Sequence, residues 1–159
     1  MVFEQERLIL IHGLEGSSQG DKAVLLRSRF PRMLTPDFQG SLDERMSQLK
    51  YQLGEKAIWT IIGSSLGGLM AALFACDHSA QVRKMILLAP ALFLAEFSHR
   101  KPDQIGVPTV VFQGSQDTIV PVAQTRVLAE AVFSTLEFHL VADDHRLYQT
   151  TQNLNWEEL

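Results

Sequence analysis

The sequence has a single cysteine, Cys76, so it cannot form an internal disulfide. A free cysteine within an apolar run is usually buried, and we expect a structural thiol at this position. The chain also lacks any apolar run approaching the roughly 18 residues that a membrane-spanning helix needs. Residues 1–7 do not resemble a secretory signal, because several charged residues lead directly into a short apolar run. We therefore expect a cytoplasmic protein with no membrane partner.

The chain carries no strong excess of charge of either sign. It has 14 lysines and arginines against 18 aspartates and glutamates, which gives a formal net charge of -4. Such a balance argues against nucleic acid as a partner. No pair of histidines has metal-site spacing, so we expect neither a metal nor another cofactor. The sequence does not indicate an oligomeric state.

Short apolar runs alternate along the chain with segments of helical character. At 159 residues the chain fits one domain spanning residues 1–159. Nearly continuous apolar runs are typical of parallel strands covered on both faces. We predict strands at residues 8–11, 57–62, 84–88 and 109–112, and weaker ones at 32–35 and 136–141. We predict helices at residues 21–29, 42–53, 66–75 and 122–132.

This alternation predicts an α/β fold with three α/β/α layers around a mostly parallel sheet of about six strands. Ser41 is expected to cap the second helix, because Glu44 follows three positions later and completes a capping box. Ligands of such sheets bind beyond the carboxyl ends of the strands. The residues that directly follow each predicted strand are therefore the candidates for chemistry.

A serine lies in a glycine-rich turn after the strand predicted at residues 57–62. Gly63-Ser64-Ser65-Leu66-Gly67 matches Gly-x-Ser-x-Gly and leads into a predicted helix, which is the context of a nucleophile elbow. Ser64 does not match this motif, because Ile62 and Leu66 occupy the two positions where glycines are needed. An ordinary strand-to-helix turn is the alternative. The flanking strand and helix favour Ser65 as a catalytic nucleophile.

A serine nucleophile needs a base and an acid that orients the base. Asp117 follows the strand predicted at residues 109–112, and His145 follows the last predicted strand. The resulting order of serine, acid and histidine is typical of α/β sheets with a nucleophile elbow. Asp143 and Asp144 are alternative acids, although immediate neighbours of a histidine rarely reach its ring nitrogen. Asp117 has its own alternative role, which is to brace its turn.

Backbone N–H groups are expected to form the oxyanion hole. One is the N–H of Leu66, at the start of its helix, and the other is that of Leu14, in the loop after the first strand. In that loop His12 and Gly13 are expected to contact substrate, or else only to end the strand. Phe93 is expected either to line the substrate pocket or to pack in the core.

Together these motifs resemble the α/β-hydrolase superfamily. The resemblance rests on His12-Gly13, the elbow at Ser65, Gly114-x-x-Asp117-x-x-Val120-Pro121 and His145, and it spans nearly the whole chain. It implies a serine hydrolase that cleaves small to medium carboxylic esters through an acyl-enzyme. The chain is most similar in kind to short, lidless, single-domain bacterial esterases, whose substrates are small molecules.

The sequence departs from larger members of that superfamily at two places. The strand before His12 begins within the first dozen residues, so we expect the two leading antiparallel strands of larger members to be absent. Where many members insert a cap, this chain has only residues 90–108, which implies an open, shallow site. Thioesterase, lactonase, amidase, peptidase and perhydrolase activities remain alternatives on the same triad. A hydrolase-like module that binds a ligand or protein without turnover is a further alternative.

Overall fold

Five parallel strands form one sheet in the computed structural model, which describes residues 4–100 and 103–159. The strands lie side by side in chain order, and every neighbouring pair is parallel. They are β1 (Leu8–Ile11), β2 (Trp59–Ser64), β3 (Val82–Leu88), β4 (Thr109–Gly114) and β5 (Leu136–Val141). All five carboxyl ends therefore meet at one edge of the sheet.

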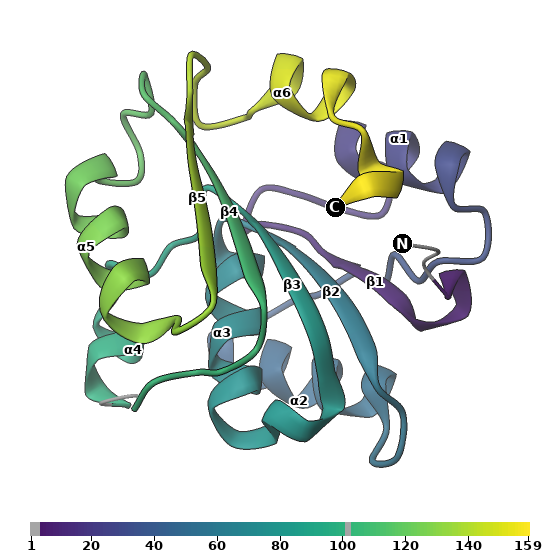
Figure 1. Ribbon diagram of the computed structural model, residues 1–159. Helices are drawn as coiled ribbons and strands as arrows, with labels where there is room; N and C mark the ends of the chain where they lie inside the picture. Colours follow the sequence, from purple (N-terminus) through teal and green to yellow (C-terminus); the bar gives the residue numbers. More distant parts are fainter. Residues whose placement is uncertain (1–3, 101–102) are drawn as a thin grey trace.

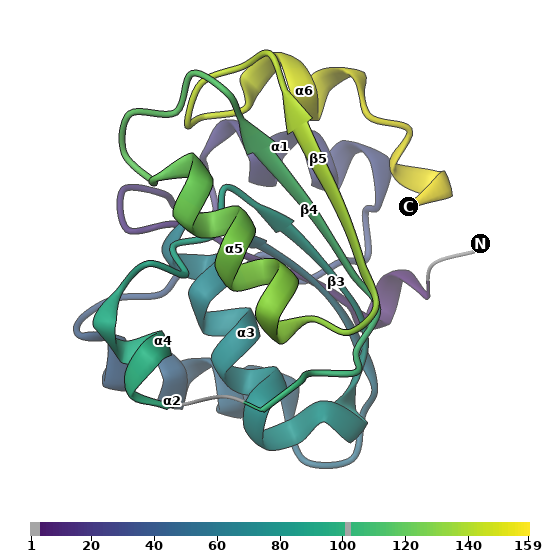
Figure 2. The ribbon, with the colours of Figure 1, turned by 60° about the vertical axis from the view of Figure 1, so that its left-hand side comes forward.

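Helices cover both faces of this sheet, as Figures 1 and 2 show. One face carries α1 (Asp21–Arg29) and α6 (Tyr148–Asn153). The other carries α2 (Leu42–Leu53), α3 (Leu66–His78), α4 (Ala95–His99) and α5 (Val122–Val132). Short 3-10 turns lie at Gln5–Arg7, Ser79–Gln81 and Trp156–Glu158. The three-layer α/β/α architecture predicted from the sequence is confirmed.

The hydrophobic core is divided between the two faces of the sheet. Along β1, Ile9 and Ile11 belong to the core beneath α2, α3 and α5, whereas Leu8 and Leu10 belong to the core beneath α1. All four side chains are buried, as expected for a strand covered on both faces. Strands β1 and β5 form the two edges of the sheet. Every residue of β5 is half-buried or exposed, so the buried strand residues of the core come from the other four strands.

The predicted boundaries of several elements hold closely. Helices α1, α2 and α5 and strands β1 and β5 begin and end where the sequence pattern placed them. The capping box of α2 is present, since Ser41 accepts from the Glu44 N–H and the Glu44 side chain accepts from the Ser41 N–H. Helix α3 runs three residues past its predicted end at residue 75. Helices α4 and α6 were not predicted.

The strand predicted at residues 32–35 is wrong, and the sheet has five strands among the described residues instead of six. Only Leu34 pairs with β1, as an isolated bridge opposite Ile9. Its N–H donates to Leu8 O, and its carbonyl accepts from Leu10 N. A parallel ladder would next need the N–H of residue 36, but Pro36 has none.

Cys76 is half-buried and packs against the core beneath α3, and burial raises the pKa of its thiol. No helix in the described part of the chain has the length and apolar character to cross a membrane. The first three residues of the segment judged not to be a secretory signal lie outside the described residues.

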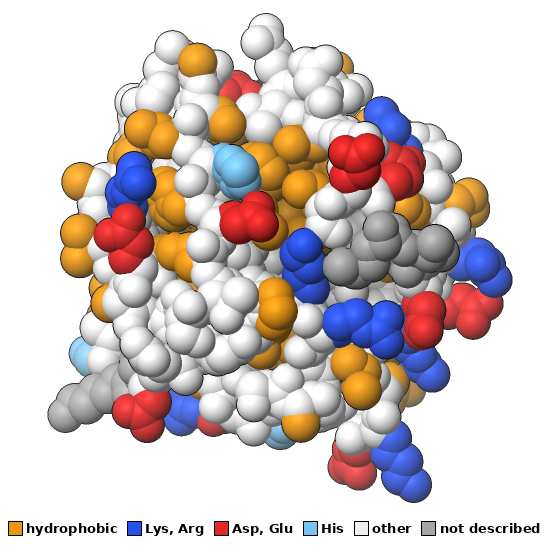
Figure 3. Space-filling view, viewed as in Figure 1, with side chains coloured by type: hydrophobic (Ala, Val, Ile, Leu, Met, Phe, Trp, Pro, Cys, Tyr) orange, Lys and Arg blue, Asp and Glu red, His pale blue; other side chains and the backbone are white. Residues whose placement is uncertain are grey.

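On the face seen in Figure 3, acidic and basic side chains are interspersed, and hydrophobic ones gather between β5 and the C-terminal segment.

Candidate active site

Ser65 occupies the sharp turn between β2 and α3, in a conformation that few non-glycine residues adopt. Its φ is 54° and its ψ is -114°. The turn is fixed by backbone hydrogen bonds, because Ser65 N–H donates to Leu88 O over 2.9 Å and Ser65 O accepts from Ala91 N over 3.0 Å. The neighbouring strand β3 thus holds the serine at the carboxyl edge of the sheet.

The glycines of the elbow are required by close backbone contacts. A Cβ built on Gly63 would lie 2.5 Å from the Gly67 carbonyl oxygen, and one built on Gly67 would overlap the Ile11 carbonyl oxygen. Neither glycine has a positive φ, so the constraint is space and not backbone conformation. The two glycines let α3 start directly against β1 and β2, which places Ser65 above the strand ends.

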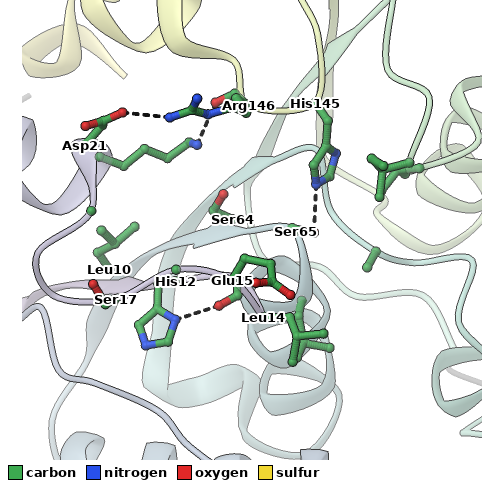
Figure 4. Close-up of a pocket in the computed structure, with 18 of the residues that line it drawn as sticks. Leu10, His12, Leu14, Glu15, Ser17, Asp21, Ser64, Ser65, His145 and Arg146 are labelled. Carbon is green, nitrogen blue, oxygen red and sulfur yellow. Dashed lines mark hydrogen bonds and ion pairs between the residues drawn. The ribbon is translucent and has the colours of Figure 1, made fainter.

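His145 links Ser65 to Asp117 through its two ring nitrogens. Its Nε2 lies 3.1 Å from Ser65 Oγ, and its Nδ1 lies 2.8 Å from Asp117 Oδ2. The three residues come from three different turns at the carboxyl edge, after β2, β4 and β5. Figure 4 shows the His145 ring above Ser65 at the wall of a pocket. The structure therefore brings together the three residues that the sequence pattern paired.

Four hydrogen bonds surround the Asp117 carboxylate, whose side chain is 0% exposed. Oδ1 accepts from the N–H groups of Ile119 and Val120 at 2.8 Å, and Oδ2 accepts from His145 and from Gln113 Nε2 at 3.0 Å. Burial alone raises the pKa of this carboxyl, but the hydrogen bonds outweigh burial and hold the pKa below its usual value. Asp117 therefore stays ionised beside the imidazole.

Asp143 and Asp144, the alternative acids, make no contact with the His145 ring. Asp143 Oδ2 accepts from the Thr150 N–H and hydroxyl, which ties the His145 loop to α6. Asp144 Oδ1 accepts from the Arg146 N–H within the loop.

The hydrogen bond from Gln113 to Asp117 was not predicted from the sequence. Gln113 lies near the end of β4, four residues before Asp117. This spacing indicates a contact with Asp117 only once the end of the strand is known.

Two N–H groups expected to form an oxyanion hole are available beside Ser65. Leu66 begins α3, and within the described residues neither its N–H nor that of Leu14 donates to a protein acceptor. The loop that carries Leu14 packs against the elbow, since a Cβ on Gly13 would meet Ser65 Cβ at 3.2 Å. Both N–H groups thus lie in segments that border the nucleophile.

His12 is buried beneath this loop. The Phe38 N–H donates to His12 Nε2 over 2.9 Å, so Nε2 is unprotonated and Nδ1 carries the proton that is donated to Gly13 O over 2.7 Å. A neutral histidine with both ring nitrogens engaged is suited to hold a loop in place. Asp37 braces the same loop, because it accepts from the N–H and hydroxyl of Ser18.

A pocket of about 610 Å³ opens beside Ser65 and His145. One part of its wall is apolar and includes Leu14, which is 62% exposed, and Ile119, which is 63% exposed. Phe93 and Leu94 also line this pocket. Figure 4 shows polar residues on the other side of Ser65, among them Ser64, Ser17, Asp21 and Arg146.

No group of three or more histidine, cysteine, aspartate or glutamate side chains in the described residues is placed to hold a metal ion. The one titratable cation that burial perturbs in the pocket is Lys22, whose pKa is lowered by burial and by Arg146. Its Nζ donates to Arg146 O over 2.6 Å, and Arg146 in turn pairs with Asp21 over 2.9 Å. These contacts fasten the His145 loop to α1.

Comparisons with known proteins agree with the observed fold. A family model described as the alpha/beta hydrolase fold matches residues 27–102. A proposed hydrolase of the alpha/beta superfamily from Xanthomonas campestris pv. campestris is 25% identical, with 91% of each chain covered and a TM-score of 0.75. A predicted CIB-like hydrolase from Thermoplasma acidophilum is 23% identical, with 96% of this chain and 86% of that one covered and a TM-score of 0.74.

Similarity at lower identity extends to a structure determined with a bound ligand. Est1E from Butyrivibrio proteoclasticus, solved with ferulic acid, is 16% identical, with 91% of this chain and 84% of that one covered and a TM-score of 0.71. At this identity the likeness concerns the fold alone. A search of curated protein sequences finds no match.

Proposed function

We propose that this chain, which has the α/β-hydrolase fold, is a serine hydrolase that cleaves small to medium carboxylic esters through an acyl-serine intermediate. The observation that carries the proposal is the continuous hydrogen-bonded path from Ser65 through His145 to Asp117. In this path each group is within the reach that proton transfer requires.

The proposed reaction starts with proton transfer from Ser65 Oγ to His145 Nε2. The serine oxygen attacks the ester carbonyl, and the N–H groups of Leu14 and Leu66 donate to the oxyanion that forms. Asp117 stabilises the imidazolium and holds its Nδ1–H in place. His145 then protonates the leaving alcohol. A water molecule, deprotonated by His145, attacks the acyl-enzyme and releases the carboxylic acid and free Ser65.

The start of α3 supports the oxyanion step. Leu66 is the first residue of this helix, so its N–H has no intrahelical acceptor and points from the positive end of the helix dipole. The first turn of α3 contains no acidic residue whose negative charge would repel an oxyanion there. A negative charge that develops beside Ser65 would therefore be stabilised where it forms.

The pocket supports a substrate of modest size. Its volume of about 610 Å³ lies within the usual range for small-molecule sites, and apolar residues form much of its wall. In the described part of residues 90–108, where a cap would stand, α4 is the one helix, and its Phe97 is buried in the core and does not line the pocket. Esters with a short acyl chain fit this open site better than long ones.

The test is hydrolysis of p-nitrophenyl esters of increasing acyl length by the wild type, Ser65→Ala and Ser64→Ala. Wild type should turn over short esters, and Ser65→Ala should lose about four orders of magnitude or more in kcat. Ser64→Ala is the matched control, because Ser64 lines the same pocket but the hydrogen bonds of the His145 ring go to Ser65 and Asp117. It should keep kcat within about tenfold of wild type. Equal activity of Ser65→Ala and wild type would refute the proposal.

A further inference from the structure

Gln113 is fully buried at the carboxyl end of β4, and only one end of its amide is satisfied. Its Nε2 donates to Asp117 Oδ2 over 3.0 Å and to Gly114 O over 3.3 Å. Its Oε1 is buried without a hydrogen-bond partner in the described chain. A buried polar atom without a partner is costly, so its presence needs a compensating reason.

The orientation of this amide is fixed by its neighbours. Exchange of the two amide ends would place Oε1 against Asp117 Oδ2 and Gly114 O, so that one acceptor would face two others. Nε2 would then be the atom without a partner. The amide is therefore held as a double donor, and one of the two acceptors is the carboxylate that contacts His145.

Gln113 and His145 share one oxygen of Asp117. The two lone pairs of Oδ1 are used by the Ile119 and Val120 N–H groups, and those of Oδ2 by Gln113 and His145. All four acceptor directions of the carboxylate are thus occupied. The carboxylate cannot rotate without losing bonds, and only one direction on Oδ2 remains for the imidazole.

We propose that Gln113 is a positioning residue that sets the direction and the strength of the Asp117–His145 hydrogen bond, and through it the proton transfer from Ser65 to His145. This inference rests on the proposed function. The amide draws electron density from Oδ2, so Asp117 binds the imidazolium less tightly than an otherwise free carboxylate would.

The first test replaces Gln113 with methionine, which has a similar length and no donor. In Gln113→Met, the acid limb of the kcat/KM profile should move to higher pH, because Asp117 then binds the imidazolium more tightly. Because Asp117 is also less well oriented, kcat on the upper plateau should fall about tenfold, while KM changes less than about twofold. Gln116→Met is the matched control, since Gln116 is exposed in the same turn and its side chain does not contact Asp117. It should leave the profile unchanged.

Gln113→Glu separates a positioning role from a packing role. Glutamate has the shape of glutamine but supplies a donor only when protonated, so it should resemble wild type at low pH and lose activity relative to wild type as the pH rises. The other charged groups at the pocket are the same in the variant and in wild type; they are Glu15, Asp21, Lys22 and Arg146, with Asp143 and Asp144 near Lys22. A variant-to-wild-type ratio that does not depend on pH would overturn the inference.

A readout without substrate keeps the inference separate from the proposed function. The proton between His145 Nδ1 and Asp117 Oδ2 should give a far-downfield proton resonance, and this resonance should move in Gln113→Met but not in Gln116→Met. If no ester is hydrolysed and Ser65 has no catalytic role, the proposed function fails. If the resonance and the acid limb are identical in wild type and Gln113→Met, the inference fails while the proposed function stands.

Discussion

The N–H of Phe38 donates to Nε2 of His12 over 2.9 Å, and this bond fixes which nitrogen of the ring carries the proton. Nδ1 then donates to the carbonyl of Gly13, the residue before Leu14. The segment that precedes α2 is thus connected through one imidazole to the loop that carries a proposed oxyanion donor. His12 lies at the pocket wall but is 6% exposed, which fits a loop-holding role better than a direct role in binding substrate.

His12→Leu is expected to lower both activity and stability. The variant leaves the Phe38 N–H without its acceptor, which should lower the free energy of unfolding by about 1–3 kcal/mol. The Leu14 loop also loses its tether, so kcat should fall about tenfold with a smaller change in KM. Urea denaturation and steady-state kinetics measure the two effects. His99→Leu, at an exposed histidine, is the control; an unchanged kcat in His12→Leu would argue against loop positioning.

Asp117→Asn should lower kcat by about four orders of magnitude, because an amide nitrogen facing Nδ1 favours the wrong tautomer of His145. The measurement is kcat at a pH on the plateau of the wild-type profile. Asp144→Asn is the matched control from the His145 loop, and we expect its kcat within about tenfold of wild type. If Asp144→Asn were crippled and Asp117→Asn were not, the assignment of the acid would be wrong.

Gly67→Ala should destabilise the fold severely. Its Cβ would overlap the Ile11 and His12 carbonyl oxygens, which are backbone atoms and cannot move aside without shifting β1. We expect a loss of about 3 kcal/mol in the free energy of unfolding, measured by urea denaturation. Gly106→Ala is the control, because the nearest atom to a Cβ there lies 3.9 Å away. Equal stability of the two variants would show that the elbow tolerates a side chain.

Stability should fall in acid, partly because of Asp117. The pKa of this carboxyl is lower in the folded chain than in the unfolded one, so protonation favours unfolding. Its contribution is complete above the ordinary pKa of an aspartate, about 3.9, and is lost as the pH falls through the lower folded value. The free energy of unfolding should therefore drop between about pH 5 and pH 2, and less steeply in Asp117→Asn. The same acid loss in both proteins would contradict this account.

Much of the fold follows from the sequence because local patterns and packing agree. Continuous apolar runs such as β1 predict strands covered on both faces, and Ser41 with Glu44 fixes the start of α2. The resemblance to α/β hydrolases is confirmed at the level of the fold by the family match and by the solved structures. The elements that were not predicted are those whose local sequence pattern is weak. Helices α4 and α6 have only five and six residues, too few for a helical period to show.

The absence of the predicted strand at residues 32–35 shows how a single proline can override strand propensity. Residues 32–35 have strand character, and Leu34 does pair with β1, but Pro36 stands where the next ladder donor is needed. In the site, Ser65, Asp117 and His145 were identifiable because each lies in the turn that follows a strand. Gln113 was not, because its role depends on the direction of a side chain within the strand and not on a motif.

The most direct test of the central claim is reaction with a fluorophosphonate probe followed by peptide mass spectrometry. Such probes modify a serine only when a neighbouring base removes its proton and an oxyanion hole receives the phosphonyl oxygen. We expect one adduct, on Ser65, at full stoichiometry in wild type and Ser64→Ala and at a small fraction of that in His145→Ala. An unlabelled folded wild-type protein, or a label on another residue, would contradict the assignment of Ser65 as an activated nucleophile.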